Sequence, residues 1–244
     1  MISPGTVKSP KRTVVRLNRP LNLTGQDFAK PLNRRRIGLL GGSFNPAHEG
    51  HRAISLEAIR RLDLDQVWWL VSPQNPLKPS QGMADLQTRV SVAKRVVGTH
   101  PKLTVTDLEQ RLGTRYSVDT VKRLLRRGRA DFVWLIGADN LAQLPEWRSW
   151  RQLVNLVPIA VFDREPYSYR ALAGRVARAF AAHRIRVRDA SRLVRAHPPA
   201  WVYFRLRRHR ASGTAIRSRG IWPPGSRTGL PVSAKGGQME GTSS

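Results

Sequence analysis

A glycine turn followed by two histidines is the segment of this chain best suited to chemistry. Residues 36–51 read RIGLLGGSFNPAHEGH, so that His48 and His51 lie three positions apart. Glycines carry no Cβ, so the backbone amides of such a turn can approach a ligand closely. In the helix expected to follow, both imidazoles fall on one face near the N-terminus, where ring N–H groups and the helix end favour anions. We therefore predict a phosphate site at the mouth of an α/β sheet.

Two other interpretations of the histidine pair compete with this one. Two imidazoles at this spacing could share one metal ion, but the sequence has no cysteine and no third ligand nearby, so we predict no metal site. Two histidines at a helix start could also be purely structural. The combination of the turn with Ser43, Asn45-Pro46 and both histidines favours anion binding, because chance rarely matches so many specified positions.

A second candidate anion site lies near the C-terminal end. Residues 211–217 read ASGTAIR, after a predicted strand and at the opening of a predicted helix. Thr214 is expected as the N-cap, and Arg217 falls in the first turn, from which a helical side chain leans back toward the free amides. Ser212, the amides after Thr214 and Arg217 would then converge on phosphate oxygens. Alone, this segment would fit a capped helix with a solvated arginine equally well.

Short apolar runs alternate with helical patterns between these two segments, and these elements must position both candidate sites. The predicted strands cover residues 37–40, 66–71, 103–106, 131–136, 158–162 and 202–206. The predicted helices cover residues 50–62, 84–97, 117–127, 150–155 and 169–182, with a last helix from Thr214. Such alternation predicts an α/β fold with a doubly wound parallel sheet. The glycine turn and residues 72–75 and 137–139 each follow a strand, at the carboxyl edge where such sheets bind ligands.

The length and composition indicate one enzyme domain between two tails. The chain has 244 residues, of which 40% are hydrophobic. We expect a basic, disordered leader over residues 1–33, the folded domain over 34–220, and a flexible Gly/Pro/Ser-rich tail over 221–244. Without cysteine there is no disulfide framework or thiol chemistry. The sequence shows no apolar run of membrane-spanning length and no secretory signal at its start, so we expect a cytoplasmic protein.

The formal net charge of +27 predicts attraction to polyanions. Nucleic acid and phosphorylated small molecules are both candidates. Arginine greatly outnumbers lysine, so compositional drift in an arginine-rich genome would also account for much of this charge. Nucleic-acid binding therefore stands as the rival hypothesis to catalysis on a phosphorylated substrate.

Both anion motifs resemble those of the nucleotidyltransferase superfamily. Residues 42–51, GSFNPAHEGH, are similar to its G-[ST]-F-D-P-x-H-x-G-H signature. Asn45 replaces the usual Asp, which keeps a turn-forming side chain but removes a negative charge. Residues 212–217, SGTAIR, resemble the S-[ST]-T-x-I-R motif that holds the β- and γ-phosphates of ATP, with Gly213 in place of the second hydroxyl residue. The resemblance implies a Rossmann-like doubly wound sheet of the nucleotidyltransferase type.

Four intervening segments resemble one branch of this superfamily, the nicotinate-mononucleotide adenylyltransferases. These segments are SPQNPLK (72–78), RYSVDT (115–120), IGADNL (136–141) and LPEW (144–147). The resemblance implies that Trp147 stacks on the pyridine ring of the acceptor. This ring is cationic, and a cation is attracted to the face of an aromatic side chain. Arg148 follows where some relatives have Tyr, and it could face the nicotinate carboxylate or solvent.

The resemblance implies that the chain joins ATP and nicotinate mononucleotide, giving deamido-NAD and pyrophosphate with Mg²⁺ on the phosphates. Such phosphoryl-type chemistry needs positioning and charge stabilisation, and no side-chain nucleophile. The implied catalytic residues are His48, His51 and Arg217. The implied ATP-binding residues are Gly42, Ser43, Phe44, His48, His51, Gly137, Asp139, Ser212, Thr214 and Arg217. The implied acceptor-binding residues are Lys78, Tyr116, Ser117, Trp147 and Arg148.

Two alternatives stay open. A pantetheine-phosphate adenylyltransferase would have an acceptor without an aromatic ring, which would leave Trp147 nothing to stack on. A nucleic-acid-binding protein would interleave basic residues with aromatics on one surface, whereas the tryptophans here fall in predicted strands or beside the predicted site, and no DNA- or RNA-binding motif is found. We therefore expect no specific nucleic-acid partner and no membrane, and the sequence leaves oligomerisation open.

Overall fold

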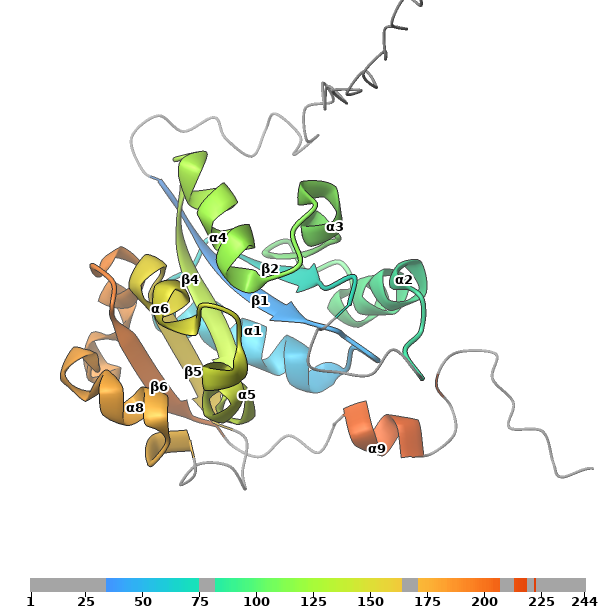
Figure 1. Cartoon of the computed structure of the whole chain (residues 1–244). Coiled ribbons are helices and arrows are strands. Elements are labelled where there is room, and N and C mark those ends of the chain that lie inside the picture. Colours follow the sequence, from blue (N-terminus) through green and yellow to red (C-terminus); the bar gives the residue numbers. More distant parts are fainter. Residues whose placement is uncertain (1–33, 75–81, 164–170, 207–212, 219–221, 223–244) are drawn as a thin grey trace, which may run out of the picture. The chain divides into compact units, whose positions relative to one another are not determined.

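The computed structural model describes residues 34–74, 82–163, 171–206, 213–218 and 222 (Figure 1). By its contacts the chain divides into one unit of residues 1–33 and another of residues 34–244. The leader predicted over 1–33 lies outside the described residues. So does the tail predicted over 221–244, apart from Trp222, and both stay predictions.

Six parallel strands form one sheet in the order β3-β2-β1-β4-β5-β6. They are β1 (Arg35–Gly42), β2 (Gln66–Val71), β3 (Leu103–Thr106), β4 (Ala130–Gly137), β5 (Ile159–Asp163) and β6 (Trp201–Arg205). This is the order of a doubly wound α/β sheet, and it confirms the predicted fold class. The order reverses between β1 and β4, so their carboxyl ends form the switch point at which ligands of such sheets bind.

Helices cover both faces of the sheet. Figure 1 shows α1 (Glu49–Leu62) and α2 (Leu86–Val97) on one face, and α4 (Ser117–Arg126) and α6 (Trp150–Leu156) on the other. A strand covered on both faces is apolar at nearly every position, and five of the six residues of β2 are buried. The shorter helical segments are α3 (Leu108–Leu112), α5 (Ala138–Gln143), α8 (Arg175–Ala179), α9 (Gly213–Ser218), and the 3₁₀ turns η2 (Leu144–Glu146), η3 (Ala181–His183) and η4 (Val187–Arg195).

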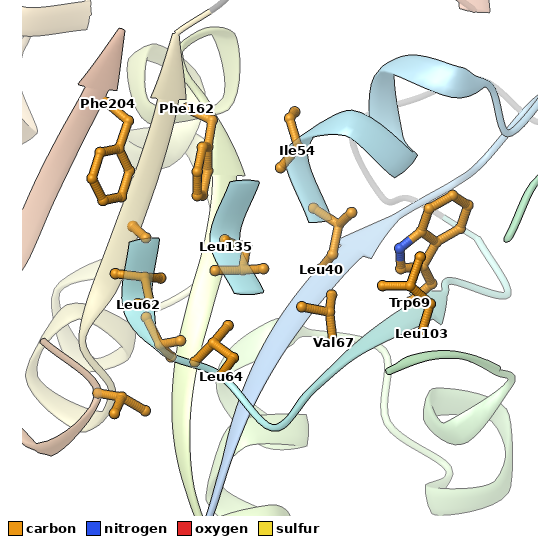
Figure 2. Close-up of a cluster of buried hydrophobic side chains, with 14 of the residues drawn as sticks. Leu40, Ile54, Leu62, Leu64, Val67, Trp69, Leu103, Leu135, Phe162 and Phe204 are labelled. Carbon is orange, nitrogen blue, oxygen red and sulfur yellow. The ribbon is translucent and has the colours of Figure 1, made fainter. Parts of the chain in front are cut away.

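The core on the α1 side joins the sheet to its first crossover helix. Figure 2 shows side chains from β1, β2, β4 and β5 gathered beneath α1, among them Leu40, Trp69, Leu135 and Phe162, with Ile54 above them. Each large side chain buried in this way contributes about 1.5–3 kcal/mol. This packing fixes the direction of the chain where β1 ends, and therefore the position of the turn that follows.

The predicted strand positions are confirmed, but one predicted helix is not continuous. Of the described part of the predicted 169–182 helix, Ala171 and Leu172 are helical, and α8 covers Arg175–Ala179. Between them Gly174 is extended, with φ −70° and ψ 165°. A 3₁₀ turn at Ala181–His183 replaces the last turn. The short segments α3, α5 and η4 were not expected. Among the described residues, no helix has the length and apolar character required to cross a membrane.

Candidate active site

The turn after β1 is held by the buried ring of Phe44. Its backbone φ of 46° lies in the left-handed region, which is uncommon for a non-glycine residue. The ring is 2% exposed and stacks on Trp69, with centroids 5.1 Å apart, while its other neighbour, His51, lies 4.8 Å away. These contacts stabilise an otherwise unfavourable turn and place His51 against the core.

The two histidines close the N-terminus of α1 through a reciprocal pair of hydrogen bonds. His48 is the N-cap, and its Nδ1 accepts from the backbone N–H of Gly50 (3.1 Å). The Nδ1 of His51 accepts from the backbone N–H of His48 (3.2 Å). Because each Nδ1 accepts, the proton of each neutral ring lies on Nε2. The ring centroids are 3.9 Å apart, so one small region holds two imidazole donors beside a helix N-terminus.

Helix α9 lies beside this turn, although it comes from the far end of the chain. Arg217 Nη1 donates to the carbonyl oxygen of Asn45 (2.6 Å), and Nη2 donates to the Thr214 hydroxyl (3.2 Å). A Cβ at Gly213 would come within 3.3 Å of Arg217 Nη1, so the glycine found there leaves room for this arrangement. The structure thus brings the two predicted anion motifs together.

One detail of the C-terminal motif was wrong. Thr214 was expected as the N-cap, but α9 begins at Gly213, so Thr214 already lies inside the first turn. Its hydroxyl accepts from Arg217 instead of capping the helix. The predicted contribution of Ser212 lies outside the described residues.

Asn45 connects three segments through its side chain. Its Nδ2 donates to the carbonyl oxygen of Gly82 (3.1 Å), and its Oδ1 accepts from the backbone N–H of Ala84 (3.2 Å). The same Oδ1 accepts from the indole N–H of Trp222 (2.6 Å). A carboxylate could make the two acceptor contacts but could not donate to Gly82. The amide found here in place of the family's Asp therefore suits these neighbours.

Two of the predicted ATP-binding residues lie at the end of β4 or just after it, at the centre of the sheet. Gly137 ends β4 next to β1, and Asp139 lies half-buried in the first turn of α5. Gly41, in β1 beside them, is required by packing, because a Cβ there would lie 2.9 Å from the Trp134 ring. Gly41 and Gly42 belong to β1 itself, so the turn begins two residues later than the sequence indicated.

The predicted acceptor-binding residues come from two neighbouring segments on the α4 side of the sheet. Tyr116 and Ser117 begin α4, and Trp147 and Arg148 precede α6, which packs on α4. The Arg148 guanidinium carbon lies 4.7 Å from the centroid of the Tyr116 ring, a cation–π distance. Trp147 is half-buried and Arg148 is exposed. The remaining predicted member, Lys78, lies outside the described residues.

Two buried ionisable residues next to these segments were missed by the sequence analysis. Arg89, near the start of α2, is 1% exposed, and Glu109, in α3, is 5% exposed. Both contact Ser72, the first residue after β2: Arg89 donates to its carbonyl oxygen (2.7 Å), and the Glu109 carboxyl interacts with its hydroxyl. Burial raises the pKa of Glu109 to about 7, although hydrogen bonds from Ser72 and Thr120 favour its ionised form.

Among the described residues, no three His, Asp or Glu side chains are grouped so that they could hold a metal ion by themselves. The β1–α1 turn brings two imidazole rings and the N-terminus of α1 together with the Arg217 guanidinium. Such a set suits phosphate oxygens.

Known proteins similar to this chain agree with that chemistry. The family model described as cytidylyltransferase-like matches residues 39–219. A relative from Bradyrhizobium sp. (strain ORS 278), named "probable nicotinate-nucleotide adenylyltransferase", is 50% identical over 189 residues, covering 77% of this chain and 98% of that protein. A relative of the same name from Parvibaculum lavamentivorans is 46% identical over 188 residues, covering 77% of this chain and 93% of that protein.

A solved structure shares the fold. The Plasmodium falciparum nicotinic acid mononucleotide adenylyltransferase complexed with NaAD aligns with a TM-score of 0.56 at 14% identity, over 75% of this chain and 83% of that one. The family match includes both the histidine turn and α9. The chain therefore belongs to the nicotinate-nucleotide adenylyltransferases, within the cytidylyltransferase-like family.

Proposed function

We propose that this chain transfers the adenylyl group of ATP to nicotinate mononucleotide, giving deamido-NAD and pyrophosphate in NAD biosynthesis. The observation that carries the proposal is the hydrogen bond from Arg217 to Asn45 across 172 positions of sequence. It connects the two predicted anion motifs at the switch point of the sheet, which supports a single triphosphate site. The names of the relatives support the same reaction.

In this proposal the histidine turn and α9 hold the triphosphate between them. His48 and His51 donate Nε2–H bonds to phosphate oxygens, together with the backbone amides of Gly42, Ser43 and Phe44. Arg217, with Thr214 and Ser212, binds the β- and γ-phosphates and stabilises the charge that builds up on the leaving pyrophosphate. A phosphate oxygen of the acceptor attacks the α-phosphorus, and the bond from that phosphorus to the bridging oxygen of pyrophosphate breaks. The attacking oxygen is already anionic, so positioning and charge stabilisation suffice.

The acceptor lies, in the same proposal, over the α4 side of β1 and β4. Trp147 stacks on the pyridine ring. Ser117 and the backbone near it bind the nicotinate carboxylate. Arg148, whose guanidinium lies over the Tyr116 ring, adds a positive charge. Lys78 completes the acceptor side. Gly137 contacts adenosine from the end of β4, and Asp139 lies beside it in the first turn of α5.

A divalent metal ion generally takes part in nucleotidyl transfer of this family, and we propose Mg²⁺ here. Mg²⁺ is bound in nucleotide sites through substrate phosphates and one or two carboxylates. Asp139, half-buried at the end of β4, supplies a carboxylate of the required kind. The metal would neutralise phosphate charge, while the side chains named above orient the two substrates.

A pyrophosphate-release assay with ATP and a panel of acceptors tests the proposal. The panel contains nicotinate mononucleotide, nicotinamide mononucleotide and phosphopantetheine. We expect the highest kcat/KM with nicotinate mononucleotide. Faster release with phosphopantetheine would assign the chain to the other branch of the superfamily, and the absence of release with any acceptor would contradict adenylyl transfer itself.

A further inference from the structure

Arg89 is a buried cation, and its hydrogen bonds to described residues all end on backbone carbonyls. Its Nε donates to Ala84 (2.8 Å), its Nη1 to Ser43 (2.7 Å) and Ser72 (2.7 Å), and its Nη2 to Pro73 (2.9 Å). The side chain is 1% exposed. Among the described residues it forms no ion pair within 4.0 Å, so its charge is compensated by carbonyl dipoles and by a longer-range attraction from Asp85.

These four carbonyls belong to three different segments of the candidate site. Ser43 lies in the histidine turn, where the triphosphate is proposed to bind. Ser72 and Pro73 leave β2 at the beginning of the segment implicated in acceptor binding. Ala84 precedes α2, and its own N–H donates to the Asn45 side chain (3.2 Å). A single guanidinium therefore joins the ATP side of the site to its acceptor side.

Only arginine can make this junction. Its planar group presents five N–H donors in a fixed fork, so it fixes the relative positions of all its acceptors. A lysine ammonium is a compact charge on a flexible stem and cannot span the same carbonyls at once. The strand order explains why these carbonyls meet: β1 and β2 are neighbours, and the Ser72 N–H donates to the carbonyl oxygen of Gly42 (2.9 Å).

We propose that Arg89 is a positioning residue, which holds the Ser72–Pro73 exit of β2 in register with the histidine turn so that the two reacting phosphates meet in line. This inference rests on the proposed function, because it needs two substrates bound on the two sides of Arg89. Arg89 is buried beneath the site and acts through the backbone. A misplacement of about 1 Å at a reacting centre can cost roughly 100-fold in rate.

The test compares Arg89→Lys with Arg95→Lys, a change at an exposed arginine of the same helix. For each protein, calorimetry measures the Kd of ATP and of nicotinate mononucleotide separately. Steady-state kinetics then measures kcat with both substrates saturating, and thermal unfolding measures the folded fraction. We expect Arg89→Lys to keep each Kd within about threefold and to lose about 100-fold in kcat. We expect Arg95→Lys to match the wild type in all three measurements.

Three results would overturn the inference. The first is an Arg89→Lys protein with more than half of the wild-type kcat. The second is a loss accounted for entirely by weaker binding of one substrate. The third is the loss of cooperative unfolding in both Arg89→Lys and Arg89→Gln, the second of which keeps an amide donor. Arg89 would then be required for folding and would have no separate positioning role. A wild-type protein that releases no pyrophosphate would instead refute the proposed function, so the two failures are distinguishable.

Discussion

Glu109→Gln should stabilise the protein at pH 8. The Glu109 carboxyl is buried in α3, and burial raises its pKa from an ordinary value of 4.5 to about 7. The unfolded chain therefore ionises this group at a lower pH than the folded chain does. Between pH 4.5 and 7 the folded state binds more protons than the unfolded state, so this group lowers the free energy of unfolding as the pH rises. Above a pH of about 7 the loss is complete.

The size of the effect follows from the two pKa values. One unit of pKa corresponds to about 1.4 kcal/mol, so the difference between 4.5 and about 7 amounts to about 3 kcal/mol. The amide oxygen that the substitution introduces can still accept from Ser72 and Thr120, but the amide never ionises. At pH 8 Glu109→Gln should gain up to about 3 kcal/mol, or roughly 6–12 °C in Tm for a domain of this size. The gain should shrink toward zero as the pH falls to about 4.5.

Urea unfolding of both proteins from pH 5 to pH 8 measures this difference directly. Glu57→Gln is the matched control, because burial of Glu57 is outweighed by hydrogen bonds from Arg61 and Arg60, which keep its pKa below the ordinary value. Glu57 stabilises the fold above its unfolded pKa and loses that effect as the pH falls through its folded pKa, so its replacement should bring no gain at pH 8. A difference between Glu109→Gln and wild type that did not change with pH would refute the assigned role of burial.

Four further predictions concern catalysis. His51→Ala should lower kcat roughly 100- to 1,000-fold through loss of a preorganised donor, and turnover above half of wild type would exclude that role. Arg217→Ala should weaken ATP binding by roughly 1.5–3 kcal/mol in a calorimetric titration, whereas an unchanged affinity would remove α9 from the site. Trp147→Ala should lower kcat/KM for nicotinate and nicotinamide mononucleotides alike, while Arg148→Ala should lower it for the nicotinate form selectively; equal losses on Arg148→Ala would leave the backbone near Ser117 as the discriminator. A chain without residues 1–33 should keep the full-length kcat, and a folded but inactive truncation would show that the leader helps to build the site.

The centre of the sheet could be predicted from the sequence because β2, β4 and β5 are apolar at nearly every position. The run QVWWLV gives β2 its observed bounds, and the run around residues 131–136 gives β4 to within one residue at each end. A parallel sheet covered by helices on both faces requires such continuous apolar runs. The alternation of these runs with helical patterns was sufficient to predict a doubly wound parallel sheet, and its ligand-binding edge stays a prediction.

The short helices could not be predicted, because they are too short to show a hydrophobic pattern. Five or six residues complete little more than one turn, so α3 and α5 show no repeating apolar stripe. Their positions depend on contacts with the sheet, which are not local in sequence. The break at Gly174 is different, since a glycine inside a helical pattern is a visible warning that lowers the helix propensity by about 1 kcal/mol.

Arg89 and Glu109 were missed because arginine and glutamate are mostly exposed in proteins, so a charge in a helix is taken for a surface residue. The carbonyls that receive Arg89 lie as many as 46 positions away and meet only because β1 and β2 are neighbours. A weak signal was nevertheless present. Arg89 shares one helical stripe with Ala93 and Val97, which are buried, whereas Arg95 lies off that stripe and is exposed. A charge on the buried stripe of a helix beside a predicted anion-binding turn therefore indicates a residue whose hydrogen bonds the backbone around it must accept.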